Sequence, residues 1–268
     1  MERVVITGIG FVIPNGIGTL EPWEHLISGK SAVDKIVRFD ASEYSSTVAG
    51  EVRVFDPAEW VTDKRKVREL DRFAQFALAA TKLAIADAQL ELTDEERESA
   101  GSIIGVGLGG LETIENVHTV LMTKGQKRIT PYFIPAAIAN MAAGQVSIQY
   151  KLKGPNFCTT SACSSSAHAI GEATQWIRRG MADVMIAGGA EATVTPLGVG
   201  GFCAMMALSK RGDSTASRPW DKGRDGFVVG EGSAILVLES LTRAKKRGAT
   251  IYAEVTGYGA SSDAHHIT

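Results

Sequence analysis

The stretch TTSACSSSAHAIG, residues 159–171, places one thiol, Cys163, among small side chains and ahead of a segment with helical periodicity. A cysteine attacks carbonyl carbons as its thiolate, and a helix N-terminus favours an anion through its unpaired N–H groups and its dipole. Ser164, Ser165 and Ser166 are residue types suited to cap such a helix. The backbone N–H of Cys163 would supply one oxyanion donor. Strand, sharp turn and helix together form the pattern of a nucleophile elbow, which makes Cys163 a candidate nucleophile.

A second interpretation applies to all three cysteines. Most single cysteines are small buried hydrophobic residues, and this is the preferred interpretation for Cys158 in a short strand and for Cys203 in GFCAMM. For Cys163 the neighbouring residues alone leave both interpretations open. The resemblance described below favours the nucleophile.

Thiol chemistry also needs a base or a proton-transferring partner, and the five histidines do not supply an obvious one. His25 and His118 lie in segments with helical periodicity. His168 is five positions beyond Cys163, about 140° around a helix, so it should point elsewhere. His265 and His266 lie in the final loop. The residues alone therefore identify no partner for the thiol.

The elements that would position Cys163 follow from periodicity and from β-branched runs. Strands are predicted at 3–10, at 102–107, shortly before Cys163, and at 182–189, 225–240 and 249–259. Helices are predicted at 70–90, 111–124 and 135–151, from the serines through Arg179, and at 241–248. Alternating strands and helices predict an α/β protein with a mixed, mostly buried sheet.

Composition excludes several classes of function. The 268 residues carry a formal net charge of −2 and are 44% hydrophobic, which argues against a general nucleic-acid-binding protein. Three cysteines without metal-binding or disulfide spacing predict no metal site and a cytoplasmic setting. No cofactor is expected. No apolar run approaches the length of about 18 residues that a membrane span needs.

A dinucleotide-binding enzyme is one rival interpretation, because glycines follow strands in VVITGIG and IIGVGLGG. Neither stretch has the full spacing of the dinucleotide-binding motif with an acidic residue about 20 positions on. Close packing of the backbone explains these glycines better.

Four longer stretches resemble a known family: ACSSSAHAIGEA, ADVMIAGGAEATVTPLGVGGF, ALSKRGDSTASRPWDKGRDGFVVGEG and KKRGATIYAEVTGYGASSDAHHIT. They are similar to the β-ketoacyl-acyl-carrier-protein synthase II family, the elongating condensing enzymes of bacterial fatty acid synthesis. The resemblance runs over residues 3–268 and about two-thirds of a family member. It implies a thiolase-like fold, a layered α/β sandwich of two halves, and a homodimer. Residues 1–249 would be the N-terminal half with the nucleophile elbow, and 250–268 the start of the C-terminal half.

The resemblance also implies a reaction. Cys163 would take an acyl group from acyl carrier protein, and the carbanion from decarboxylated malonyl-acyl carrier protein would then attack the thioester to give a 3-oxoacyl product. The family's histidine pair and its lysine lie in the C-terminal half and are absent here, so the chain is interpreted as a piece of a longer synthase. A polyketide ketosynthase and a non-condensing partner subunit are the alternatives. The latter typically lacks the cysteine.

Other positions match the family residue by residue. Leu108, Phe133 and Phe202 match positions at the acyl pocket, with Phe133 reaching the pocket of the partner subunit. Without the resemblance, ordinary core residues are an equally good interpretation of all three. Asp263 and His266 match a mobile loop. Relatives dock the acidic carrier protein at the positions of Arg65, Arg68, Lys127 and Arg128, which here lie in two basic clusters. Met206 replaces a further basic residue that some relatives have there.

Overall fold

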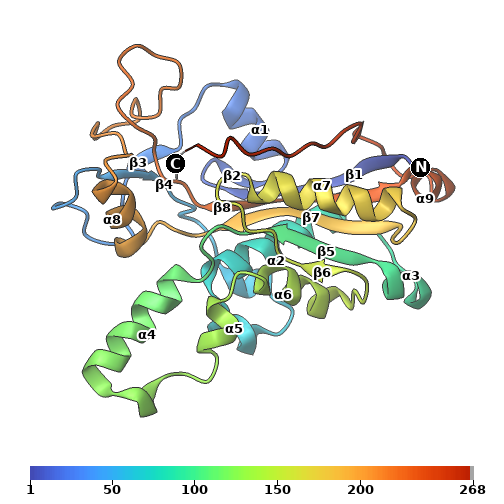
Figure 1. The fold of residues 1–268 in the computed structure, drawn as a ribbon, viewed down its shortest axis with the longest axis horizontal. Helices are drawn as coiled ribbons and strands as arrows, with labels where there is room; N and C mark the ends of the chain where they lie inside the picture. Colours follow the sequence, from blue (N-terminus) through green and yellow to red (C-terminus); the bar gives the residue numbers. More distant parts are fainter. Residues whose placement is uncertain (266–268) are drawn as a thin grey trace.

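The computed structural model describes residues 1–265 and is built on one mixed sheet (Figure 1). Its strands are β1 (Val4–Ile13), β2 (Gly16–Gly18), β5 (Gly101–Gly105), β6 (Asn156–Phe157), β7 (Val184–Glu191), β8 (Gly232–Ser240) and β9 (Ala253–Glu254). Their order is β2-β1-β8-β7-β5-β6, with β9 also paired to β1. β5 runs parallel to β6 and β7, and the other pairings are antiparallel. The predicted mixed α/β sheet is therefore confirmed.

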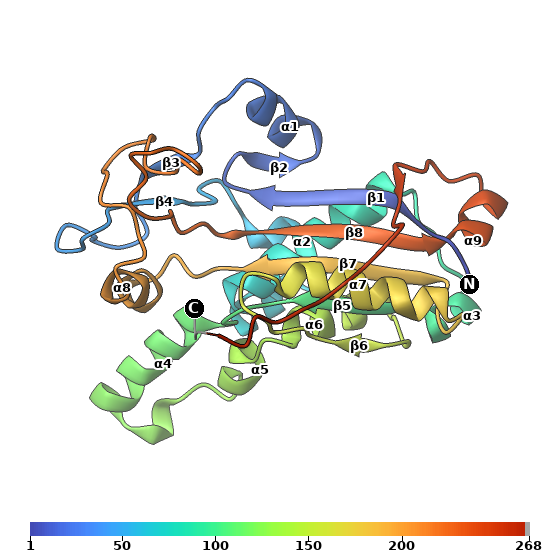
Figure 2. The same ribbon diagram turned by 45° about the horizontal axis from the view of Figure 1, so that its top comes forward.

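One long helix covers each face of this sheet. α2 (Arg72–Asp87) packs on β1, β8 and β7, and α7 (Ser165–Arg178) packs on β7 and β5 from the opposite side (Figures 1 and 2). α2 lies very close to β1: a Cβ at Gly10 would be 2.1 Å from the carbonyl oxygen of Ala80, and one at Gly8 would be 2.3 Å from that of Ala84. The first glycine stretch thus serves close helix–strand packing, as its interpretation predicts.

The remaining elements surround these layers. The shorter helices are α1 (Leu20–Ile27), α3 (Asp94–Ser99), α4 (Leu111–Lys124), α5 (Phe133–Ala137), α6 (Met141–Tyr150), α8 (Pro196–Ala204) and α9 (Leu241–Lys246). Three 3₁₀ turns, η1 (Pro57–Glu59), η2 (Lys64–Glu69) and η3 (Gln126–Arg128), and a small sheet of β3 (Val33–Lys35) and β4 (Val48–Gly50) complete the fold. α4 projects away from the sheet as an arm that ends in η3 (Figure 1). None of the helices within residues 1–265 has the length and apolar character that crossing a bilayer requires.

The predicted helix over 135–151 is wrong in one respect, because it is two helices. In a continuous helix the carbonyl of Ala137 would accept the N–H of Met141. Here it accepts the N–H of Gly110 at 3.0 Å, and Ile138 takes an extended conformation. The turn that follows β5 therefore ends α5 through a tertiary hydrogen bond that local periodicity does not contain.

Two predicted strands are shorter than expected. β8 begins at Gly232 instead of residue 225, because the preceding residues bond elsewhere: Phe227 exchanges backbone hydrogen bonds with Ala207 and Ser209. β9 keeps only Ala253–Glu254 of the predicted 249–259. The chain then crosses the outer face of α7 (Figure 2), where the ring of Tyr258 lies against Gly171. A domain boundary after residue 249 stays a prediction, and residues 266–268, including His266, lie outside the described residues.

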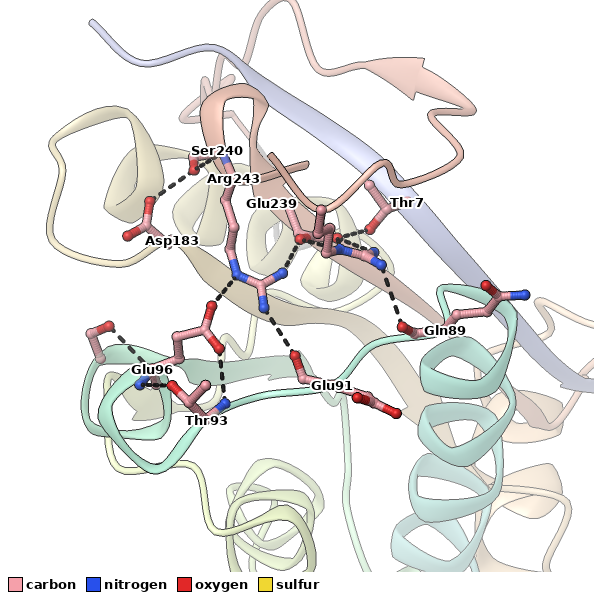
Figure 3. Close-up of polar contacts among 11 residues, drawn as sticks. Thr7, Gln89, Glu91, Thr93, Glu96, Asp183, Glu239, Ser240 and Arg243 are labelled. Carbon is pink, nitrogen blue, oxygen red and sulfur yellow. Dashed lines mark hydrogen bonds and ion pairs between the residues drawn. The ribbon is translucent and has the colours of Figure 1, made fainter. Parts of the chain in front are cut away.

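A buried carboxylate lies at the end of the sheet opposite the arm. Glu239, at the end of β8, is fully buried and bonds to Thr7, Arg243 and Arg247 (Figure 3). Arg243 also pairs with Glu96 of α3 at 2.8 Å and donates to the carbonyl of Glu91 at 3.1 Å. These bonds join α9 to the sheet and to the segment between α2 and α3.

Candidate active site

Cys163 lies in a tight turn between β6 and α7, and it is exposed. Ala162 has φ of 51°, a left-handed conformation that costs a non-glycine residue of the order of 1–3 kcal/mol. The buried hydroxyl of Ser165 holds this turn together: it donates to the carbonyl of Ala162 at 2.7 Å and accepts the N–H of Ser161 at 2.9 Å. The short strand, the sharp turn and the following helix are the elbow that the sequence predicts.

The elbow sits directly on the ends of two sheet strands. A Cβ at Gly105 of β5 would lie 2.2 Å from the carbonyl carbon of Ser165, and one at Gly189 of β7 would lie 2.5 Å from Cβ of Ser166. The hydroxyl of Thr159 donates to the carbonyl of Ser165 at 2.8 Å. Glycine at both strand positions therefore lets the start of α7 approach the sheet closely. This close packing sets the distance of Cys163 from the sheet.

The prediction that serines cap α7 through their side chains is wrong for the N-cap residue itself. Ser164 occupies the N-cap position, but its φ and ψ of −91° and 2° differ from the extended conformation that a capping side chain needs. Its hydroxyl instead donates backwards to the carbonyl of Ser161 at 2.8 Å. The serine hydroxyls thus stabilise the turn that carries Cys163 rather than the first turn of the helix.

The sequence predicts that His168 points away from the thiol, because of its angle around the helix. In the structure its ring contacts Ser161. Its Nδ1 lies 2.6 Å from the hydroxyl of Ser161, and its ring stands edge-on to that of Tyr258 with 6.2 Å between centroids. Cys158 is half-buried next to the core beneath α2, and its Sγ contacts the carbonyl of Thr159 at 3.4 Å. Cys203 is half-buried in α8.

The three predicted pocket residues lie on three elements. Leu108 lies in the turn between β5 and α4 and is 54% exposed. Phe133 is the first residue of α5 and is half-buried. Phe202 lies in α8 and stacks edge-on against Phe227, with 5.3 Å between centroids. Three cavities of the described residues, of about 340, 200 and 790 Å³, are lined by other residues, so the acyl pocket stays a prediction.

The predicted docking residues are all exposed and occupy two 3₁₀ turns. Arg65 and Arg68 lie in η2, and Lys127 and Arg128 lie in η3 at the tip of the arm. Arg65 pairs with Asp63 at 3.0 Å. The α4–α5 arm connects the two turns, since η3 ends α4 and η2 packs beside α5. The neighbouring carboxylate of Glu69, in η2, raises the pKa of the Tyr132 phenol, which precedes α5.

Two carboxylates at the turn between β5 and α4, the half-buried Glu191 and the buried Asp71, were missed by the sequence reasoning. Glu191, at the end of β7, accepts the N–H groups of Gly107, Leu108 and Gly109 at 2.6, 3.0 and 3.3 Å. Asp71 caps α2 and also accepts both the N–H and the hydroxyl of Thr113 in α4. Burial raises the pKa of both carboxyl groups, against the hydrogen bonds that lower it. An isolated Glu in AGGAEA carries no local signal of such a role, because its partners are about 80 residues away.

The fold has close counterparts among solved structures. A beta-ketoacyl synthase from Burkholderia phymatum STM815 superposes with a TM-score of 0.91 at 36% identity, over 100% of this chain and 66% of its own. The ketosynthase in the structure of AntDE with AntF, a type II polyketide synthase acyl-carrier protein, superposes with a TM-score of 0.88 at 34% identity, over 100% of this chain and 65% of that one. The architecture around Cys163 is thus the thiolase-like α/β fold of ketosynthases.

Sequence comparison agrees with this class and specifies the family. Residues 1–244 match the family model of the beta-ketoacyl synthase N-terminal domain, and the chain belongs to that family. A 3-oxoacyl-[acyl-carrier-protein] synthase 2 from Coxiella burnetii (strain RSA 493 / Nine Mile phase I) is 52% identical over 269 residues, which cover 100% of this chain. The chain spans 65% of the length of that relative. The predicted family and its extent are both confirmed.

Proposed function

We propose that this chain is the nucleophile-bearing part of a 3-oxoacyl-[acyl-carrier-protein] synthase, an acyltransferase of fatty acid elongation. The observation that carries the proposal is the exposed thiol of Cys163 in a strained turn at the start of α7. An exposed sulfur is accessible to a thioester on a carrier protein, and the small side chains of Ala162 and Ser164 leave that approach open.

The first half-reaction follows from this geometry. The thiolate of Cys163 attacks the thioester carbonyl, a new C–S bond forms, and the tetrahedral intermediate collapses with release of the carrier's thiolate, which takes up a proton. The N–H of Cys163 would donate to the developing oxyanion. In the second half-reaction the acyl group passes to the carbanion formed when a malonyl thioester loses CO₂. By the resemblance, that step uses a histidine pair that this sequence does not contain.

The proposal is tested by acyl transfer in the full-length gene product. We expect incubation with an acyl-acyl-carrier-protein thioester to add one acyl mass, located by peptide mapping on the peptide that holds Cys163. Thioester chemistry also predicts that neutral hydroxylamine removes the added mass. If no acyl group is taken up, or if it maps to Cys158 or Cys203, the proposal is wrong.

We further propose acyl carrier protein as the partner, in both its acyl- and its malonyl-loaded forms. The exposed basic residues of η2 and η3 support this, since they would complement an acidic partner. They form local basic clusters on a chain whose own net charge is negative. The structure of AntDE with an acyl-carrier protein supports it through a relative. A homodimer and a cytoplasmic setting are proposed from the family resemblance and from three cysteines without a disulfide.

Reversal of charge at the tip of the arm should weaken docking. Lys127 and Arg128 have no acidic partner within residues 1–265, so their charge is available to a partner. We expect K127E/R128E to raise the KM for a carrier-borne acyl substrate about tenfold, with kcat nearly unchanged and with a weaker dependence on salt. The matched control is K245E/K246E on α9, at the opposite end of the molecule (Figure 1). An equal effect of both variants would argue against a specific docking site.

A polyketide ketosynthase is the second candidate, and the superposition on AntDE favours it. A polyketide ketosynthase would add several malonyl-derived units in succession and leave their ketones unreduced. This repeated condensation, measured with the same full-length protein, would distinguish it from fatty acid elongation. A non-condensing partner subunit is disfavoured by the exposed Cys163.

A further inference from the structure

Glu191 holds the turn between β5 and α4 in place through its side chain. Its carboxylate accepts three successive backbone N–H groups, those of Gly107, Leu108 and Gly109. Successive N–H groups that converge in this way form a concave anion site. Here the anion is supplied by the protein itself, and no basic side chain of the described residues pairs with it. The conformation of the turn therefore depends on this one carboxylate.

The same turn is fixed on its other side by close backbone contacts. Gly109 has φ of 78°, a left-handed conformation in which a Cβ would lie 2.9 Å from the carbonyl oxygen of Ala137. Gly110 donates its N–H to that carbonyl. The turn is thus held between Glu191 and the end of α5, and the exposed side chain of Leu108 projects from the part that Glu191 binds.

The two strands that support the elbow also carry Glu191 and the turn that it binds. Glu191 ends β7, two positions after Gly189, on which Ser166 of the elbow packs. The neighbouring strand β5 supports Ser165 at Gly105 and then continues into the bound turn. One carboxylate at the ends of these two strands can therefore set the position of Leu108 relative to Cys163.

We propose that Glu191 is a positioning residue that determines acyl-chain selectivity by holding Leu108 at the pocket. The inference rests on the function proposed above and on the pocket position predicted for Leu108. Glu191 does not touch the reacting atoms. Its loss should release the 107–109 turn, change the space available to the acyl tail, and leave the thiol chemistry of Cys163 in place.

The test measures the rate of Cys163 acylation by short-, medium- and long-chain acyl-carrier thioesters in the full-length wild-type protein, Glu191→Ala and Glu191→Gln. We expect Glu191→Ala to change the ratio of long- to short-chain rates about tenfold, since a displacement near 1 Å can cost up to about 100-fold in rate. Glu191→Gln keeps one acceptor oxygen and should change the ratio less. The rate of alkylation of Cys163 by iodoacetamide should match wild type in both variants.

The matched control is Glu115→Gln. Glu115 lies in α4, and its carboxylate accepts the hydroxyl of Thr195 at 2.7 Å and the N–H of Leu197 at 2.8 Å without touching the 107–109 turn. Its variant should keep the wild-type length ratio. An unchanged ratio in the Glu191 variants, or an equal fall at every chain length together with slower alkylation, would overturn the inference. If Glu191→Ala does not fold, the near-isosteric Glu191→Gln decides. Failure of wild type to acylate at all would instead reject the proposed function.

Discussion

Cys163→Ala is expected to abolish acyl transfer and condensation in the full-length gene product, with a loss of at least about 10³-fold. Removal of a covalent nucleophile takes away the intermediate on which both half-reactions depend, and comparable substitutions in other covalent enzymes cost up to about 10⁶-fold. The side chain of Cys163 is exposed within the described residues, so replacing it by alanine removes little packing there. Stability should therefore match wild type, and the loss should reside in turnover alone. Steady-state elongation assays and a thermal denaturation curve measure the two quantities.

The chain offers two matched controls for this experiment. Cys158→Ala and Cys203→Ala remove the half-buried thiols of the chain and should keep acylation and turnover. Any effect of these two substitutions should be on stability, because each side chain packs beside a hydrophobic cluster. Cys163→Ser retains the shape with a weaker nucleophile and should be nearly inactive. Normal elongation by Cys163→Ser would show that another residue is the nucleophile.

Glu239→Gln is expected to lower the free energy of unfolding by about 3–5 kcal/mol at neutral pH. The substitution keeps the volume and one hydrogen-bonding oxygen, but it leaves Arg243 and Arg247 without the charge that they share (Figure 3). Breaking a buried ion pair by neutralising one partner leaves an uncompensated charge in a low-dielectric site. Denaturant unfolding of wild type and variant measures the difference.

This loss should depend on pH in a defined direction. Burial alone would raise the pKa of Glu239, but the hydrogen bonds from Arg247 and Thr7 and the charges of Arg247 and Arg243 outweigh it and hold the pKa below its ordinary value of 4.5. The ionised carboxylate therefore contributes stability above that value, and the contribution disappears as the pH falls through the lowered pKa. The difference between wild type and Glu239→Gln should be largest near neutral pH and shrink in acid.

The control is an ion pair of the same type at the surface. Glu98 pairs with Lys153, and both side chains are more than half exposed. Glu98→Gln should change stability little at any pH, because solvent screens such pairs. Equal and small losses in both variants would mean that the Glu239 cluster contributes no more than a surface pair does.

Much of this protein follows from its sequence by short-range rules. The bounds of α4 agree with the predicted 111–124, and α2 and β1 lie where periodicity and β-branched runs place them. The elbow was also predictable, because small residues and a turn between a strand and a helix are local features. Helical period, strand composition and turn chemistry act over a few residues, so they can be read along the chain.

Tertiary structure alone decided the features that depend on distant partners. The break between α5 and α6 comes from a hydrogen bond between Gly110 and Ala137, and neither residue by itself interrupts a helical pattern. Glu191 binds a turn more than eighty positions earlier, and Glu239 bonds to Thr7 at the other end of the chain. A carboxylate can be partly or wholly withdrawn from solvent only where donors converge on it. That convergence is produced by the packing of sheet and helices, and the sequence around each glutamate does not reveal it.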